Sequence, residues 1–168
     1  MDKIVFITGA SSGIGAGCAR KFASQGASLI LNARNVNKLS ALKEELEKQY
    51  GAKIYLLPFD VRDRKAATSA LESLPKEWQS IDILVNNAGL VIGTDKEQEG
   101  SLDEWDIVID TNIKALLAMT RLIVPGMVER KRGHIINIGS IAGDAAYPGG
   151  SVYLSLIHIS EPTRLDVI

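Results

Sequence analysis

Three glycines near the N-terminus have the spacing of a phosphate-binding turn. Gly9, Gly13 and Gly15 lie in T-G-A-S-S-G-I-G, which follows the apolar run Ile4–Ile7 and precedes a helical pattern. Glycine lets the backbone approach a pyrophosphate closely, and the N–H groups at a helix N-terminus stabilise its charge. The same residues would also suit a plain tight turn. Because the loop stands between a strand and a helix, we favour a dinucleotide site.

The end of the second apolar run indicates which dinucleotide would bind. Ser28–Leu31 leads into N-A-R-N, in which Arg34 precedes Asn35 and no acidic residue stands nearby in the sequence. A site for NAD places a carboxylate here for the ribose 2′-hydroxyl, whereas an arginine accommodates the 2′-phosphate of NADP. Arg34 can bind phosphate through two parallel N–H groups, although it could also be a solvated loop cation. We therefore expect NADP as the cofactor.

Five short apolar runs alternate with helical patterns along the chain. The runs, each of which predicts a strand, are 4–7, 28–31, 53–59, 81–85 and 135–138. Continuously apolar strands that alternate with helices are typical of a parallel sheet covered on both faces. Because crossovers between parallel strands are right-handed, the expected order is 3-2-1-4-5. The expected fold class is therefore α/β: a doubly wound, three-layer Rossmann sheet.

The helical patterns predict which faces are buried. They run from the glycine loop to 24, from Asn35 or Asn37 to about 49, from 64 to 74, from 101, and from about 112 to 130. In the first helix, Ile14, Cys18 and Phe22 recur at intervals of four, so we expect them to share a buried face. We expect the last helix to be interrupted near Pro125, which lacks the N–H of a helix interior.

The composition is that of a soluble globular domain. The 168 residues are 46% hydrophobic and 23% charged, with a formal net charge of −1. This balance argues against a nucleic-acid partner, which needs a basic surface. No apolar stretch approaches the roughly 20 residues of a membrane span. The single cysteine, Cys18, cannot form an internal disulfide, and no His, Cys and Asp cluster has metal-ligand spacing. We expect a cytoplasmic domain without metal, membrane or nucleic acid.

The motifs together resemble one enzyme family. The glycine loop, N-N-A-G at Asn86–Gly89, Asn112, Ser140 and Tyr153 resemble the classical short-chain dehydrogenase/reductases in register from Lys3 to Tyr153. Within that family, residues 73–90, 125–130 and 133–140 look like the NADP-dependent 3-hydroxy acid dehydrogenases. Those enzymes oxidise serine, allo-threonine and related 3-hydroxy acids, and reduce semialdehydes such as malonic semialdehyde. The resemblance implies an NADP-dependent oxidoreductase that acts on a small hydroxy acid or carbonyl substrate and whose complete form is a homotetramer.

The resemblance also implies a role for each matching residue. Tyr153 would be the general acid/base, Ser140 would hydrogen-bond the substrate oxygen, and Asn112 would hold a water in a proton relay. The glycine loop would wrap the pyrophosphate, Arg34 and Asn35 would hold the 2′-phosphate, Asp60 and Val61 would contact the adenine, and N-A-G would line the cofactor. The residues so expected to bind NADP are Gly9, Ala10, Ser11, Ser12, Gly13, Ile14, Gly15, Arg34, Asn35, Asp60, Val61, Asn87, Ala88, Gly89 and Tyr153.

One position departs from the family pattern. The family places a lysine four residues after the tyrosine, whereas this chain has Ile157, and no lysine occurs after Lys131. A tyrosine with its ordinary pKa near 10 leaves only about one phenolate per thousand at pH 7, and a nearby cation lowers that pKa. His158 falls on another helix face, and Arg164 lies beyond Pro162. We therefore expect this chain as written to be inactive.

Residues 154–168 follow the end of the family resemblance at Tyr153 and differ from the rest of the sequence. Residues 154–164, L-S-L-I-H-I-S-E-P-T-R, match the conceptual translation of a transposase-type sequencing adapter. We expect 1–153 to be the dinucleotide-binding domain of a truncated dehydrogenase, which the family continues for about a hundred residues, and 154–168 to be a non-native tail. A genuine divergent tail is the alternative.

Two other functions stay open at this point. A different reductase of the same family, acting on a 3-oxoacyl thioester or a sugar, is one, because the region after Tyr153 sets substrate choice in the family. A dinucleotide-binding protein without catalysis is the other, and the missing lysine favours it for the chain as written.

Overall fold

Five parallel strands form one sheet in the order β3-β2-β1-β4-β5. The computed structural model describes residues 3–93, 95–140, 142 and 151–160. The strands are β1 (Ile4–Ile7), β2 (Ser28–Leu31), β3 (Ile54–Leu56), β4 (Ile81–Asn86) and β5 (His134–Asn137). The doubly wound order expected from the sequence is confirmed.

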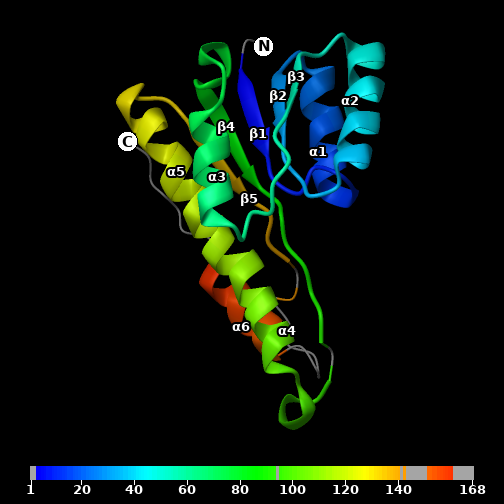
Figure 1. Ribbon diagram of the computed structural model, residues 1–168, viewed down its shortest axis with the longest axis vertical. Coiled ribbons are helices and arrows are strands. Elements are labelled where there is room, and N and C mark those ends of the chain that lie inside the picture. The colour runs from blue at the N-terminus through cyan, green and yellow to red at the C-terminus, as the bar shows by residue number, and fades with distance from the viewer. Residues whose placement is uncertain (1–2, 94, 141, 143–150, 161–168) are drawn as a thin grey trace.

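Helices cover both faces of this sheet (Figure 1). On one face lie α1 (Gly13–Ser24) and α2 (Val36–Tyr50), and on the other lie α3 (Arg64–Glu72) and α5 (Leu116–Glu129). Successive side chains of β1 enter opposite cores: Val5 and Ile7 pack with α1 and α2, whereas Phe6 packs with α3 and α5. Because both faces are covered, the central strands are mostly apolar on both sides, and the sequence shows runs instead of alternation; Asp82 and Asn86 of β4 are buried polar exceptions.

The buried face of α1 differs from the expected one. The buried residues of this helix are Gly15, Ala16, Ala19 and Ala23. Cys18 and Phe22 are only partly buried against the core, and Ile14 is 62% exposed. The expectation that Ile14 shares a buried face was therefore wrong. The small residues face the sheet, and Ile14, in the first turn of the helix, lines the pocket described below.

A continuous helical stretch replaces the two separate helices expected after residue 101. α4 (Leu102–Ile109) continues through the π-helical segment η3 (Asp110–Ala115) into α5. The expected helix start at Asn112 was therefore wrong, because a π-helical turn takes up an extra residue without ending the helix. Thr111 and Ala115 of η3 are buried.

Pro125 lies inside α5 and does not interrupt it, contrary to expectation. The proline leaves the carbonyl of Arg121 without its helical donor. Both residues are exposed, so water can supply that hydrogen bond. Ile123 and Met127, on the opposite side, are buried in the core beneath α5 and keep the helix on the sheet.

β3 is shorter than the apolar run 53–59 predicted. The pairing with β2 ends before Pro58, which has no N–H for a strand ladder. A side chain then extends the connection, because Asn32 Nδ2 donates to the carbonyls of Leu57 and Phe59 at 3.0 and 3.1 Å. These two bonds fix the start of the loop that follows β3.

The helix α6 (Ser151–Ser160) packs against α4 and η3, away from the outer strands (Figure 1). Leu156 and Ile157 are buried, and Tyr153 is half-buried. The helix therefore passes without a break through the boundary after residue 153 that the sequence suggests.

No helix in the described ranges is both long enough and apolar enough to cross a membrane. In the same part of the chain, no three His, Cys, Asp or Glu residues are grouped so that they could hold a metal ion.

Candidate functional site

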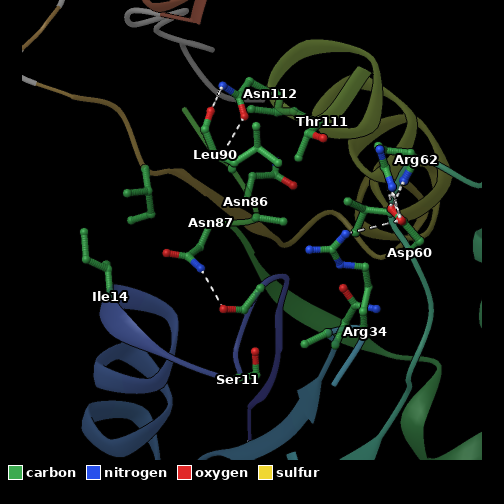
Figure 2. A pocket seen from close by; sticks show the side chains of 18 of the residues that line it. Ser11, Ile14, Arg34, Asp60, Arg62, Asn86, Asn87, Leu90, Thr111 and Asn112 are labelled. Carbon is green, nitrogen blue, oxygen red and sulfur yellow. Dashed lines mark hydrogen bonds and ion pairs between the residues drawn. The ribbon is translucent and has the colours of Figure 1, made fainter. Parts of the chain in front are cut away.

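A pocket of about 880 Å³ opens at the carboxyl ends of the strands. In doubly wound sheets ligands bind at this edge, where the strand order reverses, and here the reversal lies between β1 and β4. The loops that follow all five strands line the pocket, together with residues of η3 and α6. Figure 2 shows Ser11, Ile14, Arg34 and Asn112 reaching it from different elements.

The glycine loop approaches the loop after β4 so closely that side chains are excluded. A Cβ at Gly9 would lie 2.9 Å from both Ala88 Cα and Asn87 Nδ2, and Gly9 also has φ +65°. Gly13 has open space around it but needs glycine for its φ of +52°. Ser12, the N-cap of α1, makes no capping hydrogen bond with its side chain. The first turn of α1 therefore meets the pocket, and a helix N-terminus of this kind is suited to an anion.

Hydrogen bonds between the first and fourth strand ends hold this loop. Thr8 Oγ1 accepts from the backbone N–H groups of Asn87 and Ala88, each at 3.0 Å. Asn87 Nδ2 donates to the carbonyls of Thr8 and Gly9 at 2.9 and 3.1 Å (Figure 2). Asn87 is therefore a brace for the glycine loop as well as a lining residue of the pocket.

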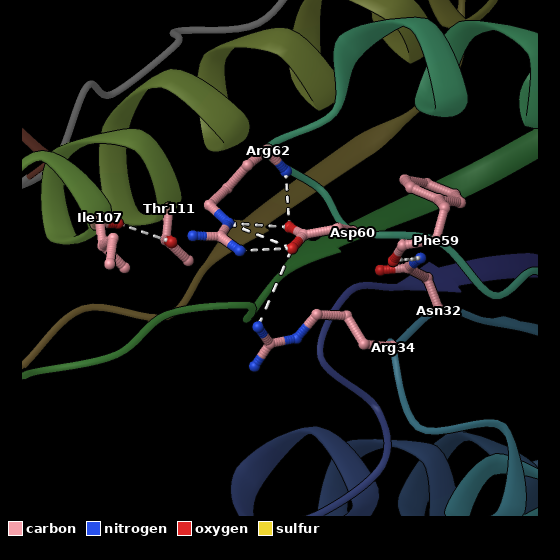
Figure 3. Close-up of polar contacts among 7 residues, drawn as sticks. All are labelled: Asn32, Arg34, Phe59, Asp60, Arg62, Ile107 and Thr111. Atoms are coloured by element: carbon pink, nitrogen blue, oxygen red, sulfur yellow. Dashed lines mark hydrogen bonds and ion pairs between the residues drawn. The ribbon is translucent and has the colours of Figure 1, made fainter.

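Arg34 has an acidic neighbour that the sequence did not show. Its Nη1 lies 3.9 Å from Asp60 Oδ2, although the two residues are 26 positions apart (60 minus 34) (Figure 3). The observation that no carboxylate stands near Arg34 holds along the chain but is wrong in space, because the ends of β2 and β3 are neighbours in the sheet. Asn35 caps α2, accepting from Lys38 N at 3.0 Å, and also lines the pocket.

Arg62 is a functional candidate that the sequence analysis missed. Its Nη2 lies 2.7 Å from Asp60 Oδ2, and its Nε is 3.1 Å from each carboxylate oxygen (Figure 3). The Arg62 guanidinium, through these bonds, holds the pKa of Asp60 below its ordinary value. The spacing D-x-R in a loop was the available signal, because a side chain two residues on can fold back onto an aspartate.

Asn112 joins the π-helical segment to the loop after β4. Its Oδ1 accepts from Leu90 N at 2.9 Å and its Nδ2 donates to Leu90 O at 2.8 Å (Figure 2). Each half of the side-chain amide therefore makes one hydrogen bond to the backbone of Leu90, which lines the pocket. Placing the Asn112 side chain at that point depends on η3, whose π-helical turn changes which residues face inward.

The three expected catalytic residues are not all at the pocket wall. Tyr153 and Asn112 line it, and so do Leu156 and Ile157 of α6. Ser140 is not among the lining residues, although Ile138 and Gly139 are. Its Oγ accepts from Ala142 N at 3.2 Å. At the position where the family has a lysine, Ile157 is 6% exposed.

Most residues expected to bind NADP lie around the pocket. Those that line it are Gly9, Ser11, Ser12, Ile14, Arg34, Asn35, Asp60, Val61, Asn87, Ala88, Gly89 and Tyr153. Ala10, Gly13 and Gly15 do not line it but shape the loop: Ala10 is buried, and its N–H donates to the Asn32 carbonyl at 2.9 Å.

Two buried asparagines at the pocket were not expected as site residues. Asn32 and Asn86 are 1% and 4% exposed, and the Oδ1 atom of each has no hydrogen-bond partner among the described residues. Both residues line the pocket. A buried acceptor of this kind is expected to bind water or a ligand.

The sequence matches a known family over most of its length. Residues 3–155 match the family described as short chain dehydrogenase. The NADP-dependent 3-hydroxy acid dehydrogenase YdfG of Escherichia coli (strain K12) is 49% identical over 150 residues, which cover 89% of this chain and 59% of the relative. The NADP-dependent 3-hydroxy acid dehydrogenase of Schizosaccharomyces pombe is 44% identical over 154 residues, which cover 91% and 60%. The chain thus spans about three fifths of the length of these curated relatives.

Solved structures agree with the sequence match. Serine dehydrogenase from Escherichia coli superposes with a TM-score of 0.87 at 47% identity, covering 93% of this chain and 70% of that one. The closed form of serine dehydrogenase complexed with NADP+ gives a TM-score of 0.85 at 46% identity, covering 93% and 61%. Fold, glycine loop and sequence lead to the same conclusion: the chain belongs to the short-chain dehydrogenase family.

Proposed function

We propose that the chain is the NADP-binding part of an oxidoreductase that transfers a hydride between the nicotinamide and the CH–OH group of a small 3-hydroxy acid, or reduces the matching semialdehyde or ketone. The observation that carries this proposal is a single pocket lined by the glycine loop, Arg34 and Tyr153. The similarity to NADP-dependent 3-hydroxy acid dehydrogenases supports the choice of cofactor and substrate class.

The residues at the pocket fit an adenine dinucleotide with a 2′-phosphate. A Cβ at Gly9 would meet Ala88 and Asn87, so glycine is needed for the loop to pack against the loop after β4. The first turn of α1 lies at the pocket, where a pyrophosphate would be held. Arg34 stands at the end of β2, where the adenosine ribose is held in this fold. The buried acceptor of Asn32 lies on the same side of the pocket and can bind a donor. Arg34 and Asn35 would hold the phosphate, and Asp60 and Val61 would contact the adenine.

The proton chemistry is proposed for residues at the opposite end of the pocket. The bound nicotinamide supplies or accepts the hydride. Tyr153 would donate its phenolic proton to the carbonyl oxygen in reduction and accept the hydroxyl proton in oxidation, Ser140 would hydrogen-bond that oxygen, and Asn112 would hold a relay water. Ile157 offers no cation beside Tyr153, so we propose that the chain as written turns over no substrate.

Residues 154–168 are proposed to be a non-native tail, because 154–164 match a translated adapter. The genomic sequence at the locus tests this. A contiguous reading frame that encodes these residues would overturn the proposal, and a different sequence after Tyr153 would support it.

A direct test of the function compares two proteins. The first is the 168-residue chain, and the second carries, in place of residues 154–168, the region that follows the tyrosine in the Escherichia coli relative. We expect NADPH-linked turnover of 3-hydroxy acids and semialdehydes only from the second. Tyr153→Phe in that second protein is the control, and it should lower kcat by about 10²-fold or more because the general acid is lost.

The two proteins also separate the alternatives. Turnover by the unmodified chain would refute its proposed inactivity. Because the region after Tyr153 sets substrate choice in the family, the substrate class is tested with a third protein, completed with the natural C-terminal region found at the genomic locus. Turnover of 3-oxoacyl thioesters or sugars by that protein, instead of 3-hydroxy acids, would replace the substrate class. Ile157 specifically favours a second candidate for the chain as written, a dinucleotide-binding protein without catalysis. NADPH binding without turnover by either protein would establish that candidate.

A further inference from the structure

The Asp60 carboxylate stands between two arginines that hold it very unequally. Arg62 makes a fork, with Nη2 2.7 Å from Oδ2 and Nε 3.1 Å from both carboxylate oxygens. Its backbone N–H adds a bond to Oδ1 at 3.0 Å. Arg34 approaches only to 3.9 Å and its side chain is 69% exposed, whereas that of Arg62 is 32% exposed. Asp60 therefore makes its hydrogen bonds to Arg62, and Arg34 makes only a longer ion pair with it (Figure 3).

A second negative charge also acts on Arg62. Beyond its bonds to Asp60, the negative charge of Asp110 in η3 also helps to raise the pKa of the Arg62 guanidinium. The loop that carries Asp60 is fixed in turn by the bonds from Asn32 to Leu57 and Phe59. The Asp60–Arg62 pair thus lies in a loop that hydrogen bonds from Asn32 hold in place, so its geometry does not depend on a bound ligand.

The position of this carboxylate matters for the choice of ligand. Among the described residues that line the pocket, Asp60 is the single acid. A carboxylate at the end of the second strand of such a sheet accepts from a ribose 2′-hydroxyl, which is how NAD is preferred over NADP. Asp60 follows β3 instead, but its carboxylate lies 3.9 Å from Arg34 at the end of β2, so its negative charge would oppose a 2′-phosphate bound there. An unrestrained Asp60 could also pair closely with Arg34 and occupy the cation that a 2′-phosphate needs.

We propose that Arg62 is a specificity-determining residue that acts through Asp60: its fork neutralises the carboxylate and holds it away from Arg34, so that Arg34 remains available to a 2′-phosphate. Arg62 is a positioning residue in this proposal and does not itself bind the phosphate. The inference rests on the proposed NADP function and deepens it, since it names the Arg62–Asp60 pair as the reason why the pocket would not prefer a free 2′-hydroxyl.

The test measures the preference of the 168-residue chain for a 2′-phosphate. Titration calorimetry gives the Kd of adenosine 2′,5′-bisphosphate and of adenosine 5′-monophosphate, and the ratio of the two Kd values is the preference. Using the ratio removes any effect of a variant on adenine binding. No turnover is needed, so the readout does not depend on whether the chain is catalytically active.

Three variants and a control are compared with the unchanged chain. Arg62→Gln frees Asp60 and should lower the preference by about tenfold or more, because a full negative charge then faces the phosphate at short range. Arg62→Gln combined with Asp60→Asn has the net charge of the original chain and should restore the preference to within about threefold of it. Arg62→Lys keeps the charge but loses the fork, and its preference should fall by less than that of Arg62→Gln.

Arg20→Gln is the matched control. Arg20 makes a similar fork to Glu45, with bonds of 2.6 and 2.8 Å, between α1 and α2, and neither residue lines the pocket. Arg20→Gln removes one positive charge, as Arg62→Gln does. If a general loss of positive potential were the cause, the preference for the 2′-phosphate would therefore fall in Arg20→Gln as well. We expect no change in it. Far-ultraviolet circular dichroism and a thermal melt verify that each variant is folded, and Arg62→Lys replaces Arg62→Gln if the latter does not fold.

Each outcome decides a different point. If the double variant stays as low as Arg62→Gln, Arg62 binds the phosphate directly and the proposal is wrong. If Arg62→Gln keeps the original preference, Arg62 is only structural. If the unchanged chain does not prefer the 2′-phosphate at all, the proposed NADP function fails first, and this inference fails with it.

Discussion

At the scale of single residues, the pocket depends on charges that the fold brings together. Asp60 and Arg62 share the loop after β3, and the pairing of β2 with β3 brings Arg34 to them. Arg34 was predicted from the sequence because its position at the end of a strand has a known physical meaning. Arg62 was missed because the D-x-R spacing only permits a contact with Asp60, and the importance of that contact depends on Arg34, which the fold brings to the same carboxylate.

The Asp60–Arg62 contact makes stability depend on pH with a defined sign. Hydrogen bonds from Arg62 hold the pKa of Asp60 below its ordinary value in the folded state. The contact therefore contributes fully above the pKa of an unfolded aspartate, and the contribution is lost as pH falls through the lower folded pKa. Because the pair is partly exposed, we expect Asp60→Asn to lower the free energy of unfolding at pH 7 by only about 0.5–1 kcal/mol.

Denaturant unfolding of the chain and of Asp60→Asn at pH 7 and at about pH 2.5 measures this difference. The difference should be clear at pH 7 and should be smaller at the lower pH, because protonation of Asp60 begins to remove the contact. Asp106→Asn, at an exposed position of α4, removes the same charge and serves as the control. An unchanged difference at both pH values would contradict the electrostatic explanation.

At the scale of elements, helix ends and strand ends decide where the site can form. The first turn of α1 reaches the pocket because the glycine loop packs against the loop after β4, and η3 brings Asn112 to Leu90. The sequence predicted the glycine loop from its spacing. It did not predict η3, because a π-helical turn has no composition signature and is set by which residues the neighbouring elements bury.

Two glycines of α1, two residues apart, should respond oppositely to alanine. A Cβ at Gly15 would lie 2.5 Å from Asn87 Nδ2 and closer still to the Gly9 carbonyl, whereas one at Gly17 would meet nothing within 4 Å. Gly15→Ala should therefore destabilise the fold by about 1–3 kcal/mol through overpacking. Gly17→Ala, at an exposed helix position, should stabilise it by about 0.5–1 kcal/mol.

Thermal and denaturant unfolding of the two variants give both values. Gly17→Ala is the internal control, because it adds the same methyl group to the same helix. Equal effects of the two substitutions would show that the approach between the glycine loop and Asn87 is not tight in solution.

At the scale of the whole molecule, assembly remains a prediction. Relatives of this family are expected to form tetramers through the long helix after Asn112 and the helix that follows Tyr153. In this chain α5 exposes Leu117, Leu122 and Val128, at 60%, 36% and 53%. Apolar side chains repeated along an exposed helix face are a common feature of subunit interfaces.

Light scattering coupled to gel filtration tests this prediction. The protein that carries the Escherichia coli relative's region after Tyr153 should be a tetramer, and the 168-residue chain should be smaller because one of the two helices differs. Leu117→Glu in the longer protein should weaken assembly, whereas Glu129→Gln, at an exposed position near the end of the same helix, should not. A tetramer formed by the unmodified chain would contradict the prediction.

The sequence alone determined the strand order, the place of the glycine loop and the choice of Arg34, because burial on both faces, helix–strand alternation and the backbone freedom of glycine are local properties. Only the tertiary structure decided that Ile14 faces the pocket, that Asn112 binds Leu90, and that Arg34 approaches the Asp60 carboxylate. The physical reason is distance along the chain. Interactions between side chains on different strand ends exist only after the sheet has aligned those ends.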